Sequence, residues 1–600
     1  MPDPNPRAEY TRRHLAHESG LARFQRIESQ ISNLRLGVFL VGVLVMGLAF
    51  RSDVLSWIYV APPLLAFAAL VIWHEVVVRR MRRELLLRDY YQAGLDRLEG
   101  VYPGAGSTGD TLVAADHVYA RDLDIVGEQS LFHRLNGTHT SGGELALAKF
   151  LTEPCTSGEV RARQAAVAEL RPRLDLREQF ALHAPQVQAD VRPRALVEWA
   201  EGKRPYLRPG VYGLVIGATV ASAGLLLLSL YLSFWPALAG ILAVDLAILA
   251  LFKHTIQRVT SDLALPSREL RVLGQVLGLI EQEKFETGML AQLQQAVGRD
   301  GVAASVAIKR LDSLNHLLEL QGNQMFIPLG IVLFWPLHVA AATDRWRRRH
   351  GAAVGDWLEA VGVFEAVQSV ATYAYEHPED AVPEIGGTVA TGEDFVLEAE
   401  GLAHPLLAPG EAIPNDVRLG SDQRLLIISG SNMSGKSTLM RTIGINVVLA
   451  QAGAPARATR FVWTPCALGA TMRVHDSIHN GTSRFYAEIL RLRQILDLAE
   501  GELPVLFLLD ELLHGTNSHD RAIGAAAVLR GLLVRGAAGV ITTHDLAITH
   551  LATGELSAAR NMHFEDHFEG AELKFDYTLR DGVVRKSNAL ELMRRIGLKI

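Results

Sequence analysis

One stretch in the C-terminal third of the chain has the residue types and the spacing that bind phosphate. Gly430 and Gly435 bracket four residues and are followed directly by Lys436 and Ser437, which completes a G-x-x-x-x-G-K-[ST] motif. An apolar run typical of a buried strand, 424–429, precedes the motif, and a helical pattern follows it. In that context backbone N–H groups wrap a phosphate, and the helix N-terminus adds the positive end of its dipole. We therefore expect a phosphate site made of Gly430, Ser431, Asn432, Met433, Ser434, Gly435, Lys436, Ser437 and Thr438.

Two further strand-like runs end in polar groups that complete this chemistry. The run 504–509 is followed by Asp510 and Glu511. The first acid is suited to binding Mg²⁺, and the second is suited to activating a water molecule. The run 539–543 ends at His544, which is placed to sense a γ-phosphate or the attacking water, although a single histidine can also be structural. These groups predict ATP hydrolysis with ATP and Mg²⁺ as cofactors. Ser437 and Asp510 would hold the metal, and Glu511 and His544 would be catalytic.

The elements that must position these groups belong to a long chain of mixed composition. Its 600 residues are too many for one core and suggest three or four domains of about 100–200 residues each. Hydrophobic residues make up 49%, which is high for a soluble protein, but 21% of residues are charged, so the chain is no simple bundle of spans. The net charge of −6 argues against a globally basic nucleic-acid-binding protein. Cys155 and Cys466 provide no disulfide framework or metal cluster, which fits a reducing compartment.

Four apolar stretches fall into two pairs, each typical of a membrane hairpin. The first pair comprises residues 36–50 and 57–78, and the second comprises residues 211–232 and 234–252, with approximate bounds. A bilayer span needs roughly 20 apolar residues, so only the first stretch is short. Arginine and lysine flank both pairs at their outer ends. The positive-inside bias therefore predicts a multi-pass protein of the cytoplasmic membrane, with the ATPase domain in the cytoplasm.

Three features of this apolar part leave alternatives open. The hairpins could instead be buried helices of a large soluble core, although the charges on both flanks argue against it. A fifth apolar run, 326–342, contains Pro328 and Pro336, and we expect a core or interfacial helix there. Asp245 lies inside the fourth stretch, where an acid either indicates function or is bonded to a neighbouring helix.

Helical periodicity dominates the rest of the chain before the phosphate motif. From about 122 to 201 and from 263 to 375, apolar residues recur every three or four positions, as in amphipathic helices. Residues 140–144 resemble the signature loop of ABC transporters, but that loop follows the P-loop in its family, so the position here excludes the role. A Pro/Gly-containing stretch, 377–387, resembles a linker. We expect three parts: 1–110 with the first hairpin, 111–384 as an all-α core with the second, and 385–600 as an α/β P-loop domain.

The C-terminal motifs resemble those of the MutS family. The phosphate loop shares the unusual pair Asn432-Met433 with that family, and 508–520 is similar to its second motif with the loop that follows. The segment Gly481-Thr-Ser-Arg-Phe-Tyr-Ala-Glu488 resembles the family's Gly-x-Ser-x-Phe-x-x-Glu, and 542–545 resembles its histidine switch. Upstream, 131–169 is similar to the entry to the family's helical core and lever. The resemblance covers about 131–598 and is interrupted by the second hairpin.

This resemblance implies a fold, cofactors and partners. It implies a P-loop NTPase domain of the ABC-ATPase-like MutS type, preceded by an all-α lever and core that carry two transmembrane hairpins. In MutS dimers the serine that corresponds to Ser483 reaches the γ-phosphate on the partner. The resemblance thus implies a homodimer with two composite ATP sites. It also implies DNA as a partner, in mismatch repair or in sensing another DNA structure.

Departures from the family keep other functions open. The sequence contains no Phe-x-Glu, the motif of the family's mismatch-reading domain, and an apolar hairpin stands where that domain would be. The leading hypothesis is a membrane-anchored ATPase in which ATP switches the dimer and the switch is coupled to DNA. The alternatives are a membrane-remodelling or transport-coupled ATPase and a scaffold ATPase, neither of which binds DNA.

Overall fold

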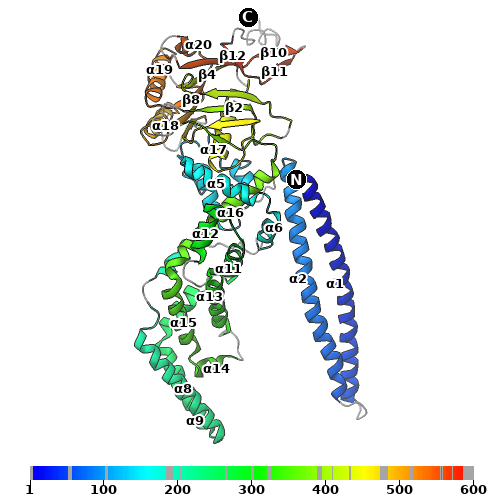
Figure 1. The fold of residues 1–600 in the computed structure, drawn as a ribbon. Coiled ribbons are helices and arrows are strands. Elements are labelled where there is room, and N and C mark those ends of the chain that lie inside the picture. Colours follow the sequence, from blue (N-terminus) through cyan, green and yellow to red (C-terminus); the bar gives the residue numbers. More distant parts are fainter. Residues whose placement is uncertain are drawn as a thin grey trace. The chain divides into compact units, whose positions relative to one another are not determined.

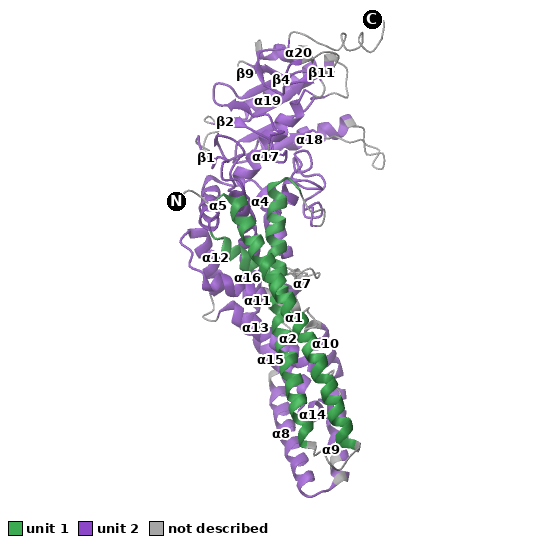
Figure 2. Cartoon of the chain, turned by 90° about the vertical axis from the view of Figure 1, so that its right-hand side faces the viewer, with its two compact units in different colours: residues 1–105, 173–182 green, residues 106–172, 183–600 purple. Residues whose placement is uncertain are grey.

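The chain divides into two compact units, residues 1–105 with 173–182 and residues 106–172 with 183–600 (Figure 2). We describe them from a computed structural model. It covers residues 5–51, 57–101, 106–183, 193–202, 205–263, 267–298, 303–320, 326–387, 395–408, 410–431, 434–472, 484–513, 518–553, 556, 558–569 and 572–584.

Unit 1 consists of two long helices and most of a short one. α1 (Pro6–Arg51) and α2 (Ala61–Leu98) form a hairpin, and α6 (Leu174–His183) contributes to its polar end (Figure 1). There Arg13 forms an ion pair of 3.0 Å with Glu178, and the Tyr91 hydroxyl donates to the same carboxylate at 2.7 Å. The first predicted apolar stretch is thus the end of a helix of 46 residues, because the polar residues before it are helical as well.

The apolar ends of the long helices are exposed within their own unit. In the most apolar windows of α1 and α2, 0% and 11% of the residues are buried, and in α8 (Pro209–Tyr231) of unit 2 the share is 17%. Within the described residues three helices are long and apolar enough to cross a membrane. A fourth would be α9 (Trp235–Leu251) with α10 (Lys253–Leu263), a pair bent by 65°. These stretches are therefore apolar surfaces that the rest of their own unit leaves largely exposed.

In unit 2 the helix α16 (Val354–Glu376) is the central packing element. It is buried along most of its length and contacts α4 (Ser141–Thr152) and α5 (Ser157–Leu170). At the α4 crossing, a Cβ on Gly362 would lie 2.6 Å from the carbonyl oxygen of Gly142. Residues 140–144 therefore serve helix packing, with Thr140 as the N-cap of α4. The other helices of this part are α3 (Leu131–Leu135), α7 (Pro193–Glu201), α11 (Ser267–Gln282), α12 (Gly288–Gly298) and α13 (Ala304–Glu319).

The fifth apolar run forms two helices that lie against the second apolar hairpin. α14 (Ile327–Val332) contacts α8 and α9, and α15 (Trp335–His350) contacts α8. His338 of α15 is bonded to the Thr219 hydroxyl of α8 at 2.9 Å. Between α8 and α9, Asp245 is buried and accepts a hydrogen bond of 2.6 Å from Ser222. Asp245 is therefore an acid bonded to a neighbouring helix.

The C-terminal part of unit 2 is an α/β domain. Among the described residues, one sheet has the strand order β12-β9-β4-β8-β7-β6, parallel except for β12, and a second has the order β1-β5-β2-β3. The strands of the first sheet are β4 (Leu425–Ser429), β6 (Ala467–Thr471), β7 (Val505–Leu509), β8 (Ala538–Thr543), β9 (Ala559–His563) and β12 (Arg580–Asp581). The others are β1 (Glu384–Ile385), β2 (Leu397–Leu402), β3 (Asn415–Leu419) and β5 (Arg460–Trp463), with the hairpin of β10 (Asp566–Glu569) and β11 (Glu572–Phe575).

Both faces of the parallel sheet are covered by helices. Alternate residues such as Leu425 and Phe507 join one core with α18 (Arg484–Leu498) and α19 (Ser518–Val534). On the other face, Leu508 lies against Gly444 of α17 (Lys436–Gln451). Burial on both faces explains why these strands are continuous apolar runs, and the carboxyl ends of parallel strands then meet at one edge of the sheet.

Candidate nucleotide site

The phosphate loop joins β4 to α17, as its sequence predicts. Gly430 and Gly435 have φ values of 154° and 100°, conformations that side chains rarely adopt. A Cβ on Gly435 would also lie 2.9 Å from the Tyr577 ring. Both glycines are thus required by the backbone, and α17 begins directly after the second. Ser431 and Ser434 belong to the described loop and Thr438 to the first turn of α17, whereas Asn432 and Met433 lie outside the described residues.

Lys436 is folded over its own loop. Its Nζ donates to the carbonyl oxygens of Gly430 at 3.0 Å and Ser431 at 2.7 Å. Burial lowers the pKa of this lysine, against the opposing effect of the nearby Glu511 and Asp510 carboxylates. A phosphate chain bound at this loop would contact the buried, positively charged ammonium group of Lys436.

Three oxygen-bearing side chains from different elements meet at the carboxyl edge of the sheet. Ser437 Oγ donates to Asp510 Oδ2 at 2.6 Å, and Thr542 Oγ1 donates to the other oxygen of Asp510. The backbone N–H of Glu511 donates in turn to Thr542 Oγ1 at 3.1 Å. A hydroxyl and a carboxylate are ligands that suit Mg²⁺, which keeps several waters and takes further oxygens from phosphates. Within the described residues, no group of three or more His, Cys, Asp or Glu side chains is arranged for a metal.

Glu511 and His544 lie in contact beside this cluster. His544 Nε2 lies 2.5 Å from Glu511 Oε1, and its Nδ1 lies 2.9 Å from the carbonyl oxygen of Gly430. Glu511 has a φ of 50°, so its backbone turns sharply after β7. The candidate base is thus held by the candidate γ-phosphate sensor, and both adjoin the phosphate loop.

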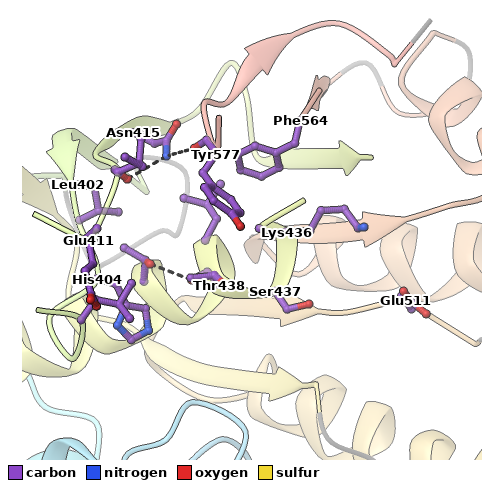
Figure 3. Close-up of a pocket in the computed structure, with 16 residues that line it drawn as sticks. Leu402, His404, Glu411, Asn415, Lys436, Ser437, Thr438, Glu511, Phe564 and Tyr577 are labelled. Atoms are coloured by element: carbon purple, nitrogen blue, oxygen red, sulfur yellow. Dashed lines mark hydrogen bonds between the residues drawn. The ribbon is translucent and has the colours of Figure 1, made fainter. Parts of the chain in front are cut away.

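A cavity of about 570 Å³ extends from the phosphate loop (Figure 3). Lys436, Ser437 and Glu511 line its polar part, while Phe564 and Tyr577 bring aromatic rings to its wall. A buried phosphate end with an aromatic wall suits a nucleoside triphosphate whose base needs an apolar contact.

The sequence motifs did not predict the two aromatic side chains of this wall. Phe564 follows β9, and its N–H donates to the Ser429 carbonyl at 3.1 Å. Tyr577 follows β11, and its carbonyl accepts from Asn415 at 3.0 Å, while Asn415 accepts from the N–H of Leu579 at 2.7 Å. Isolated aromatic residues after short strands carry no motif, so only the fold brings them to the cavity.

The predicted trans serine, Ser483, lies outside the described residues. The end of the same motif is described. Glu488 of α18 is buried, and its Oε1 accepts from the N–H of Leu513 at 2.6 Å. This contact fixes α18 to the turn after Asp510 and Glu511.

Parts of the chain are similar in sequence to known proteins. Residues 426–599 match the family model described as MutS domain V. The "Endonuclease MutS2" of Thermomicrobium roseum is 32% identical over 356 residues, which are 52% of this chain and 42% of that protein. The "DNA mismatch repair protein MutS" of Natronomonas pharaonis is 32% identical over 267 residues, 43% of this chain and 29% of that protein. The chain thus spans less than half the length of either relative. Residues 426–599, which carry the phosphate loop, therefore form a domain of the MutS family.

Proposed function

We propose that this chain is a Mg²⁺-dependent ATPase that works as a homodimer held at the cytoplasmic membrane. The observation that carries the ATPase part is the Ser437–Asp510 hydrogen bond beside the buried Lys436 ammonium. In this proposal Lys436 leaves the loop carbonyls for the phosphates, and Glu511 orients and deprotonates the attacking water. Bound Mg²⁺ would supply positive charge to the phosphate oxygens. His544, in contact with both Glu511 and the loop, would report the γ-phosphate to the rest of the domain.

The homodimer follows from the resemblance of 481–488 to the family's motif. Ser483 would complete the partner's site, so ATP would close the interface between two copies and hydrolysis would relax it. The helices around α16 lead into this domain and would carry the movement.

The membrane part of the proposal is supported by the exposed apolar helices. The apolar windows of α1, α2 and α8 are almost unburied, and basic residues flank them. Such surfaces are costly in water, whereas a bilayer would cover them. Both apolar hairpins would therefore cross the membrane, with the ATPase domain in the cytoplasm.

DNA is the proposed partner of the switch. Support for it comes from the names of the relatives, one an endonuclease and one a mismatch repair protein. The competing candidate is a membrane-remodelling, transport-coupled or scaffold ATPase without DNA. The feature that favours it is the size of the exposed apolar surface on three long helices.

The proposed ATP hydrolysis and the proposed DNA binding can both be tested on the full chain purified in detergent. We expect Mg²⁺-dependent ATP hydrolysis that Lys436→Ala abolishes, and DNA binding that depends on ATP and weakens steeply with salt. Homoduplex, mismatched and branched DNA should be compared, with Lys436→Ala as the nucleotide-dead control. Hydrolysis without DNA binding at low salt would overturn the DNA part and support the competing candidate. Absence of hydrolysis would overturn the ATPase itself.

A further inference from the structure

The second apolar hairpin contains a buried acid that the proposed ATPase cycle does not use. Asp245 of α9 is 3% exposed, and the Ser222 hydroxyl of α8 donates to its carboxylate at 2.6 Å. Within the part of the chain that the structure describes, Ser222 makes the only hydrogen bonds to this carboxylate, and no basic side chain forms an ion pair with it. An acid inside a membrane helix without a partner charge calls for a functional explanation.

The helices packed against α9 offer Asp245 no compensating charge. α14 contains no titratable residue, and α8 has none besides Tyr212 and Tyr231. The basic residues of α10 occupy exposed positions and are Lys253, His254 and Arg258. A lone carboxylate charge is costly inside a bilayer, so a membrane around this hairpin favours the neutral acid.

A proton is the cation that fits this pair of side chains. Asp245 and Ser222 together offer few oxygen atoms, whereas hard metal cations take about six or more oxygen ligands. Among the described residues no group of three or more His, Cys, Asp or Glu side chains is arranged for a metal. A proton needs a single carboxylate oxygen, and the Ser222 hydroxyl can then either donate to the acid or accept from it.

A line of polar side chains leads away from this pair. Thr219 lies one helical turn before Ser222 on α8, and its hydroxyl lies 2.9 Å from Nε2 of His338. The other ring nitrogen of His338, Nδ1, lies 3.4 Å from the Tyr212 hydroxyl. That hydroxyl accepts a hydrogen bond of 3.0 Å from the exposed Arg345. Hydroxyl groups and imidazole can both donate and accept, which is what a proton relay requires.

This line reaches Asp245 from one end of the hairpin. The helical rise from Tyr212 to Ser222 is about 15 Å, which is half of the roughly 30 Å hydrocarbon core of a bilayer. The side chains of Thr219 and Ser222 are about 5–6 Å apart at Cβ, a gap that one water molecule bridges. Toward the α8–α9 turn, the hydroxyl of Ser229 is bonded to a backbone carbonyl, at 2.8 Å. The line therefore starts at the end with the basic residues, which is cytoplasmic in the proposed orientation.

We infer that Asp245 is a proton-binding site that is loaded from the cytoplasmic side through His338 and Thr219. The inference rests on the proposed crossing of the membrane by the α8–α9 hairpin. Loading adds one proton to a carboxylate oxygen, and the resulting neutral acid keeps a hydrogen bond to Ser222. His338 gains a proton at Nδ1 and releases one from Nε2 to the Thr219 hydroxyl, which passes its own proton on toward Ser222.

Infrared spectroscopy of the full chain in liposomes at neutral pH tests whether Asp245 holds a proton. A neutral carboxylic acid has a C=O stretching band that carboxylates lack, and Asp245→Asn should remove one such band. Other buried acids contribute equally to both proteins and cancel in the difference spectrum. Ser222→Ala should keep the band and move it to higher frequency, because the acid loses a hydrogen bond. No band difference between the wild type and Asp245→Asn would mean that Asp245 is ionised, and would overturn the inference.

Transfer of the same samples into D₂O tests the route. The acid band shifts when deuterium replaces the proton, so its time course reports exchange at Asp245. His338→Phe keeps an aromatic ring beside Tyr212 but should slow exchange by about 100-fold, as for loss of a positioned proton-transfer group. Thr219→Val, of similar shape, should slow it as well. Ser229→Ala removes a hydroxyl of the same helix outside the line and is the matched control, with exchange at the wild-type rate. Equal rates in all these proteins would overturn the route.

Failure of this inference is distinguishable from failure of the proposed membrane crossing. A membrane-impermeant maleimide that labels Ser233→Cys in intact cells reports the crossing without any reference to Asp245. If Ser233→Cys is labelled and the acid band is absent, the hairpin crosses the bilayer and the proton site alone is wrong. If Ser233→Cys reacts only after lysis, the crossing is wrong and the inference falls with it.

Discussion

Ser437 at the start of α17 donates a hydrogen bond of 2.6 Å to Asp510 at the end of β7, although the two are 73 residues apart in sequence. The contact exists because β4 and β7 both flank β8 in a parallel sheet, so their carboxyl ends share one edge. It brings a hydroxyl oxygen and a carboxylate oxygen together at that edge. The candidate metal site is therefore organised by the sheet.

Asp510→Asn should remove most of the Mg²⁺-dependent ATP hydrolysis. The amide keeps the size of the side chain but loses the charge that Mg²⁺ needs, so we expect turnover to fall by about 100-fold or more. Turnover is measured across a Mg²⁺ titration in the full chain. Asp497→Asn, at a solvent-exposed position of α18 that pairs with Arg493, is the matched control and should leave turnover unchanged. Wild-type turnover in Asp510→Asn would contradict the assigned metal site.

Glu511→Gln should separate ATP binding from hydrolysis. The substitution keeps a side chain that can contact His544 but removes the base, a group that typically contributes about 10²–10⁴-fold. ATP should still bind, and nucleotide-driven association of two copies should persist instead of decaying. Light scattering with ATP, followed over time beside phosphate release, measures both. If the variant hydrolysed ATP at the wild-type rate, another group would have to be the base.

The parts of this molecule that the sequence predicts are those fixed by local chemistry. The phosphate loop needs Gly430 and Gly435 for backbone reasons, and the strands before Asp510 and His544 are continuous apolar runs because both sheet faces are covered. Phe564 and Tyr577 reach the cavity only through strand order, which no short pattern encodes. The hydrogen bond from the backbone N–H of Met472 to Asp122 spans 350 residues, so it too depends on the complete fold.

Gly362→Ala should destabilise the crossing of α16 and α4. The new methyl group would lie 2.6 Å from the carbonyl oxygen of Gly142, which is backbone and cannot move freely. Overpacking of this kind costs roughly 1–3 kcal/mol. Gly355→Ala in the same helix meets only ordinary contact, 4.0 Å from Val197, and should be neutral or slightly stabilising. Denaturant unfolding of the two variants compares them, and equal midpoints would contradict the close crossing.

Buried Glu365 should make the stability of unit 2 depend on pH. Burial raises the pKa of this carboxyl from 4.5 to about 7, against hydrogen bonds from Thr140 that lower it. The folded state therefore holds a proton that the unfolded chain releases above about pH 4.5. The stabilisation of the neutral form is complete below that pH and is lost as the pH rises through about 7, by roughly 3 kcal/mol.

Glu365→Gln tests this dependence because the amide stays neutral. The free energy of unfolding, measured by denaturant from pH 5 to 8, should fall less with pH in the variant than in the wild type. Burial also raises the pKa of Asp380 to about 7, and that contribution is the same in both proteins, so the difference between the two curves isolates Glu365. Parallel curves would mean that Glu365 does not titrate in this range.

The turn between α8 and α9 should reach the outer side of the membrane. Ser233 is exposed at this turn, between the two apolar helices, whereas Ser261 is exposed in α10, beyond the bend. The native Cys155 and Cys466 are buried, and burial raises the pKa of both thiols, so they react slowly with maleimides. In intact cells, a membrane-impermeant maleimide should label Ser233→Cys, while Ser261→Cys should react only after lysis. Labelling of Ser261→Cys in intact cells would reverse the orientation. Failure of Ser233→Cys to react in intact cells, with reaction after lysis, would mean that the α8–α9 hairpin does not cross the bilayer.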